Sequence, residues 1–142
     1  TPALEPFRDL LADILHIEPE QNDEDYQESL EFLSHLGLNS DHVTDIRNLL
    51  LRQTSDKRGQ ASTWRAIEQA FVGLCLDCPI IVALEDTHYL TDQELALVLK
   101  TLKRLTDGNP ILFILSRRGQ IPKQHQNLGQ IVALGPFDIP TY

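Results

Sequence analysis

Two adjacent carboxylates, Glu85 and Asp86, follow directly after the apolar run Ile80–Leu84. Such a run is typical of a strand covered on both faces in a parallel sheet, and α/β sheets bind ligands beyond the carboxyl ends of their strands. Acids held there need a cation or hydrogen bonds to offset their desolvation. In phosphoryl transfer the cation is Mg²⁺, with one carboxylate ordering its coordination and a neighbour able to polarise the attacking water. The alternative is a turn whose acids cap backbone amides.

A second polar group, Ser116, Arg117 and Arg118, follows the apolar run Ile111–Leu115. If both runs are parallel strands of one sheet, these side chains lie at the same edge as the acidic pair. A guanidinium there could reach the γ-phosphate of a nucleotide and stabilise the charge that develops in transfer. The alternative is that the arginines are solvated or pair with acids elsewhere in the chain.

The elements that must position these residues alternate between strand and helix over residues 79–134. A capping box at Thr91 and Glu94 predicts a helix start, and Gly108 to Pro110 predicts its end. The apolar segment 130–134 predicts a third, shorter strand. Alternation of this kind predicts parallel strands joined by crossovers, and therefore an α/β fold.

The first part of the chain is predicted to be helical. Apolar residues at helical spacing predict helices at residues 6–18, at 26–36 with Gly37 as the C-cap, and from a start near Asp41 to residue 50. An exposed loop is predicted at 53–60. A fourth helix is predicted from an N-cap at Ser62 to Pro79. Whether the first three helices pack on the sheet is left open by the sequence.

The composition of the chain limits the classes of function that it can have. The chain has 142 residues and a net charge of −9, with 13 acidic against 5 basic residues in the first 60, which disfavours direct nucleic-acid binding. No apolar run is long enough to span a membrane and no signal-peptide pattern is present, so we expect a cytoplasmic protein. Cys75 and Cys78 lack a second cysteine pair, which favours buried structural thiols over a zinc or redox site.

The segments PIIVALEDTHYLTDQELALVLKTLKRL, PILFILSRRG and QIVALGPFD, together with the opening TPALEPFRDLLADIL, carry a family resemblance. The chain resembles the AAA-like P-loop ATPase module of STAND signalling proteins, found in large bacterial cyclases, LuxR-type activators and kinase-linked sensors. The resemblance implies a partial three-layer P-loop sandwich over residues 1–142. Residues 1–60 would form a helical insertion and 61–142 the α/β part.

The resemblance also implies roles for single residues. Glu85 matches the position that coordinates Mg²⁺, and Asp86 the neighbouring position that activates water. Ser116 and Arg118 match a Thr-x-Arg pattern that senses the γ-phosphate, with Arg117 beside them. The implied function is an ATP-binding and ATP-hydrolysing switch that controls an attached output domain.

The phosphate-binding pattern G-x-x-x-x-G-K-[ST] does not occur in the sequence. That loop supplies most phosphate contacts, so we expect ATP and Mg²⁺ to bind only in an intact parent, and this chain alone to turn over no ATP. A start at Thr1 and the absence of Met fit a segment of such a parent. The expected partners are the missing loop, a lid and an output domain, with self-association left open. The alternatives are a degenerate interaction scaffold and, less favoured, a CheY-like receiver.

Overall fold

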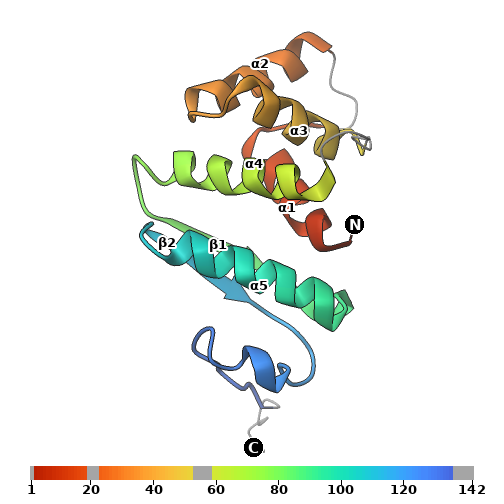
Figure 1. Cartoon of the computed structure of the whole chain (residues 1–142), viewed down its shortest axis with the longest axis vertical. Helices are drawn as coiled ribbons and strands as arrows, with labels where there is room; N and C mark the ends of the chain where they lie inside the picture. The colour runs from red at the N-terminus through yellow and green to blue at the C-terminus, as the bar shows by residue number, and fades with distance from the viewer. Residues whose placement is uncertain (1, 19–22, 53–58, 136–142) are drawn as a thin grey trace, which may run out of the picture.

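A computed structural model describes residues 2–18, 23–52 and 59–135 of the chain (Figure 1). The elements in these ranges, in chain order, are the 3₁₀ helix η1 Pro2–Leu4, α1 Glu5–Ile14, α2 Asp23–His35, α3 Ser40–Leu50, α4 Gly59–Leu74, β1 Ile80–Leu84, the 3₁₀ helix η2 Thr87–Tyr89, α5 Asp92–Thr106, β2 Ile111–Leu115 and the 3₁₀ helix η3 Lys123–His125. The mixed helix and strand class predicted from the sequence is confirmed. Most of the predicted loop at 53–60 lies outside the described residues.

The elements are stacked along the long axis of the molecule (Figure 1). Helices α2 and α3 lie at one end, α1 and α4 in the middle, and the sheet with α5 beyond them. The segment after β2 forms the other end. Helix α4 contacts both α3 and α5, so it links the N-terminal helices to the sheet region.

The sheet consists of β1 and β2, which run parallel with Ile80 opposite Ile111 and Leu84 opposite Leu115. The prediction that residues 80–84 and 111–115 are parallel neighbours is therefore confirmed. Helix α5 connects them and starts at the predicted capping box. Thr91 Oγ1 accepts a hydrogen bond from the Glu94 amide at 3.2 Å, and Glu94 accepts one from the Thr91 amide at 2.8 Å. The box satisfies two amides that the first turn would otherwise leave unpaired.

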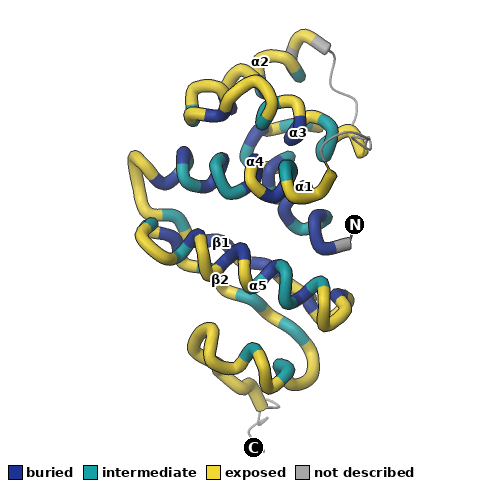
Figure 2. The backbone as a smooth tube through the Cα atoms, in the orientation of Figure 1, coloured by how far each residue is buried: buried dark blue, intermediate teal, exposed yellow. Residues whose placement is uncertain are grey.

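One hydrophobic core joins the N-terminal helices to the sheet. Figure 2 shows buried residues concentrated along α4 and on the inner sides of α1 and α5. Phe7 of α1 makes edge-to-face contacts with Trp64 at 5.2 Å and Phe71 at 6.2 Å between ring centroids, and Phe71 in turn contacts Phe113 of β2 at 6.0 Å. These aromatic contacts form a continuous path from α1 through α4 to the sheet. The helix nearest the N-terminus therefore packs into the same core as the strands.

Close packing also occurs where α4 passes the end of α2. A Cβ atom added to Gly73 would lie 2.3 Å from the backbone oxygen of Leu36. The absence of a side chain at position 73 is what lets the two backbones approach so closely. The turn at Leu36 continues into Gly37, whose φ of +92° is the left-handed conformation expected of the predicted C-cap.

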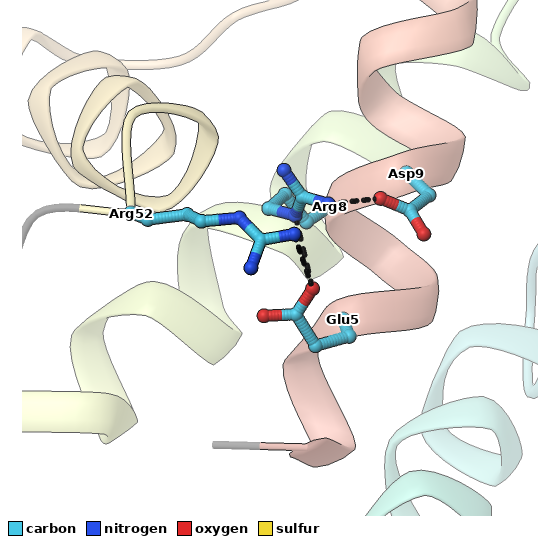
Figure 3. Close-up of polar contacts among 4 residues, drawn as sticks. All are labelled: Glu5, Arg8, Asp9 and Arg52. Atoms are coloured by element: carbon cyan, nitrogen blue, oxygen red, sulfur yellow. Dashed lines mark hydrogen bonds and ion pairs between the residues drawn. The ribbon is translucent and has the colours of Figure 1, made fainter.

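Ion pairs tie the first helix to the end of the third on the surface (Figure 3). Arg8 pairs within α1 with Glu5 at 3.2 Å and Asp9 at 2.5 Å, and Arg52, just after α3, reaches Glu5 at 3.4 Å. Arg52 is mostly exposed, so its pair with Glu5 contributes little to stability, about 0–1 kcal/mol.

The prediction of a third strand at residues 130–134 is wrong. The segment has no strand structure, and Ile131, Val132 and Leu134 are 48%, 70% and 91% exposed. A strand exists only where a neighbour completes its ladder of hydrogen bonds, and this segment pairs with neither β1 nor β2. Its apolar residues favour a strand conformation, but among the described residues no neighbouring strand is available for it to pair with.

The expectation that the strands are covered on both faces is also wrong for the described part of the chain. Val82 and Leu84 face the core, whereas Ile81, Leu112 and Ile114 on the opposite face are 70%, 55% and 53% exposed. Alternation along each strand puts successive side chains on opposite faces, and only one face is packed. Within the described residues, one face of the sheet is covered and the other is exposed.

Details at the helix ends differ from the prediction too. Helix α3 is capped by Asn39, which accepts the His42 amide at 2.8 Å, so it starts before Asp41. Helix α4 begins at Gly59, and Ser62 lies inside it with its hydroxyl hydrogen-bonded to the buried carboxylate of Asp45 in α3. The carboxylate outcompetes the backbone for that hydroxyl.

Helix α4 ends at Leu74, several residues before the proline at 79. Cys75 is buried as predicted, and its thiol contacts the Val72 carbonyl at 3.2 Å. The prediction for Cys78 is wrong because it is exposed in the turn that follows the helix. No group of three or more His, Cys, Asp or Glu residues that could hold a metal ion occurs among the described residues.

Candidate functional site

The loops that leave the two strands are joined to each other by backbone hydrogen bonds. The Ser116 amide donates to the Leu84 carbonyl at 3.0 Å, which extends the strand ladder by one step. The Thr87 amide and hydroxyl both donate to the Ser116 carbonyl, at 2.9 and 3.1 Å. Thr87 is 1% exposed, so this double contact is shielded from water. The residues after β1 and β2 are therefore held at one rim of the sheet, which we call the strand-end rim (residues 85–88 and 116–118).

Asp86 occupies a special backbone conformation at this rim. Its φ of 55° and ψ of 38° are left-handed, a region that aspartate and asparagine tolerate better than most residues. Its amide donates to Ser116 Oγ at 3.3 Å. Its carboxylate side chain is 74% exposed and lies 3.9 Å from His88 Nδ1. The backbone of Asp86 is thus fixed while its carboxylate points into solvent.

Glu85 and Arg118 extend from the same rim without binding to it. Both are exposed, and within the described ranges neither makes a hydrogen bond or ion pair. The two carboxylates at 85 and 86 are too few for an all-protein metal cage. Mg²⁺ is commonly held by one or two carboxylates, with water and substrate phosphates completing its octahedron. Glu85 and Asp86 supply that number of carboxylates from adjacent residues of the rim.

Arg117 differs from its neighbour because it is half-buried and lines a cavity of about 500 Å³ beside β2. Nε and Nη1 of this guanidinium are buried and have no hydrogen-bond partner among the residues described. Thr87 lines the same cavity, so the cavity opens next to the strand-end rim. The structure thus directs the two consecutive arginines to different surroundings.

The negative charges of the first helix act on Tyr89, the residue that follows His88 of the rim. Partial burial raises the pKa of the Tyr89 hydroxyl above its ordinary 10.0, and the negative charges of Asp9, Glu5 and Glu94 raise it further. Tyr89 ends η2, three residues after Asp86. The acids of α1 therefore act on the hydroxyl that closes this short helix.

The structure brings together part of the predicted site. Asp86 and Ser116 are in direct contact, and Glu85, Arg117 and Arg118 share their rim without touching them. Two relevant residues were missed by sequence reasoning. Thr87 follows the acidic pair immediately, but nothing in the sequence marked it as the clamp on the Ser116 carbonyl. His125 faces the cavity from η3, and no sequence signal identified it.

Comparisons of the chain with protein-family models, curated proteins and solved structures found no match. Among the described helices, none has the length and apolarity needed to cross a membrane.

Proposed function

We propose that this chain is the metal-facing part of an ATP-dependent regulatory switch of the P-loop class, completed by a phosphate-binding loop outside residues 1–142. The proposal includes the three-layer sandwich that such a module forms when its remaining strands are present. An attached output domain would respond to the nucleotide state. The observation that carries the proposal is the hydrogen bond from the Asp86 amide to Ser116 Oγ, which couples the acidic pair to the hydroxyl on the next strand.

That hydrogen bond leaves both groups chemically available. A serine hydroxyl has one donor and two acceptor positions, and Ser116 uses an acceptor position toward Asp86. Its own O–H remains free to donate to a phosphate oxygen. The Asp86 carboxylate takes no part in the contact and stays exposed. Metal binding would therefore not require any of these contacts to break.

The acidic pair supports the proposal through its lack of strong partners. Within the described part of the chain the only ion pair of the Asp86 carboxylate is with His88 Nδ1 at 3.9 Å, and the Glu85 carboxylate has no ion pair or hydrogen bond. Bound Mg²⁺ would neutralise charge on the β- and γ-phosphates. Glu85 would hold the metal, Asp86 would orient the attacking water, and the exposed guanidinium of Arg118 would approach the γ-phosphate. Fixed positions at the ends of adjacent strands reduce the reorganisation that this arrangement needs.

The test uses the polypeptide in which residues 1–142 are joined to their phosphate-binding loop. Glu85→Gln and Asp86→Asn remove each carboxylate while keeping size, and asparagine tolerates the left-handed backbone at 86. We expect Mg²⁺-dependent ATP turnover to fall at least about a hundredfold in each variant. Asp92→Asn, an exposed acid on the first turn of α5, is the matched control and should retain turnover.

Two results would contradict the proposal. Unchanged turnover in both carboxylate variants would remove the acidic pair from the reaction. Absence of turnover in the intact polypeptide, with signalling intact in both variants, would favour the interaction-scaffold alternative. Both results are separable from misfolding because each variant can be compared with wild type by thermal melting.

A further inference from the structure

The cavity beside β2 has mostly apolar walls. It is enclosed by α5, by β2 and by the segment after it, with apolar side chains that include Leu99, Leu102, Ile114, Ile121 and Leu128. Its volume of about 500 Å³ is within the range of small-molecule sites, roughly 300–1,000 Å³. The cavity is therefore large enough for an organic ligand and apolar enough to favour one.

The ionisable residues that line the cavity are all basic. No acidic residue is found among the described residues that line it, although the whole chain has a net charge of −9. Lys103, Arg117 and His125 supply the basic groups. Lys103 already bonds to Asp107 at 3.2 Å. Arg117 and His125 are thus the basic groups left for a ligand.

Both groups have buried nitrogen atoms without partners. Arg117 Nε and Nη1 and His125 Nε2 are shielded from solvent and unpaired among the residues that the structure describes. A buried donor left unpaired is costly, and the cost is larger for a charged group. A ligand oxygen that accepts from these nitrogens would relieve that cost. Two separate elements, the loop after β2 and η3, each contribute a residue with such a nitrogen to the lining of one cavity.

From these observations we propose that the cavity binds a small organic monocarboxylate with an apolar tail. The carboxylate accepts hydrogen bonds from Arg117 and His125, and the tail fills the apolar space between α5 and residues 128–132. One fixed guanidinium charge matches a single negative charge, whereas a phosphate dianion would be left partly uncompensated. The acidic pair does not line this cavity, and the proposed ligand needs neither Mg²⁺ nor ATP.

The experiment titrates the 142-residue chain with octanoate by calorimetry and follows the methyl resonances of Ile114 and Leu128 by NMR. Two further compounds separate the contribution of the tail from that of the charge. 1-Octanol has the apolar tail without the charge, and acetate has the charge without the tail. We expect saturable octanoate binding with shifts at both methyl groups. We expect 1-octanol and acetate to bind at least about tenfold more weakly than octanoate.

Variants test the protein side of the same contact. Arg117→Gln and His125→Gln should each weaken octanoate binding at least about tenfold, whereas Lys123→Gln, an exposed charge on η3, should leave it unchanged. Absence of saturable octanoate binding, equal affinity for 1-octanol, equal affinity for acetate, or full affinity in Arg117→Gln would each overturn the proposal. The titrations with octanoate, 1-octanol and acetate use wild-type protein, so their results remain valid even if a variant fails to fold. No nucleotide is present, so failure here leaves the ATPase proposal untouched.

Discussion

Replacing Gly73 with alanine tests the close contact between α4 and the turn after α2. In an ordinary helix interior this change is stabilising by about 1 kcal/mol, because glycine is the poorer helix former. Here the new Cβ would lie 2.3 Å from the Leu36 carbonyl oxygen and 2.7 Å from its Cβ. The first of these atoms belongs to the backbone, so the helix itself must shift. Overpacking of this kind costs about 1–3 kcal/mol, and so short a distance puts it at the upper end.

The net expectation for Gly73→Ala is a loss of about 2 kcal/mol, that is, a fall in Tm of roughly 6–10 °C. Thermal melting followed by circular dichroism measures it, with urea unfolding as a second assay. Gly129→Ala is the matched control, because a Cβ there meets nothing within 4 Å, and it should change stability by less than about 0.5 kcal/mol. If Gly73→Ala melts at or above the wild-type temperature, the contact between α4 and Leu36 is not as described.

Two further predictions concern buried and ionisable groups. Ser62→Ala should destabilise the chain by about 1–3 kcal/mol in urea unfolding, because it leaves the buried Asp45 carboxylate without its hydroxyl partner. An equal effect from the exposed Ser34→Ala would show that the contact is not responsible. The raised pKa of Tyr89 predicts that stability falls as pH rises above 10.0, because the unfolded chain loses that proton before the folded one does. Tyr89→Phe should lessen this alkaline loss in denaturation measured across pH, and an undiminished loss would contradict the assignment.

Local sequence signals predicted the elements around the strand-end rim well. The apolar runs bounded by proline and charge gave both strands and their parallel pairing. The capping box at Thr91 has the predicted hydrogen bonds in both directions. These features depend on a few adjacent residues, so propensity and turn chemistry determine them without knowledge of distant contacts.

Features that depend on distant residues were not predictable. Ser62 was expected to cap a helix, and its hydroxyl instead bonds to Asp45, seventeen positions earlier. Residues 130–134 have the pattern of a strand, but whether such a segment pairs depends on an available neighbour. Arg117 and Arg118 are adjacent and chemically identical, and only the packing around β2 distinguishes the half-buried one from the exposed one. Tertiary context decides these cases.

The aromatic path through the core gives the molecule a built-in optical reporter. Trp64 is the single tryptophan of the chain, is 5% exposed and touches Phe7 edge to face. Its emission should be blue-shifted in the folded state and should move to longer wavelength when α1 detaches, even if the strands stay paired. Fluorescence would therefore follow the docking of the first helix, while far-ultraviolet dichroism follows the backbone. Coincidence of the two signals would mean that the N-terminal helices and the sheet unfold as one cooperative unit.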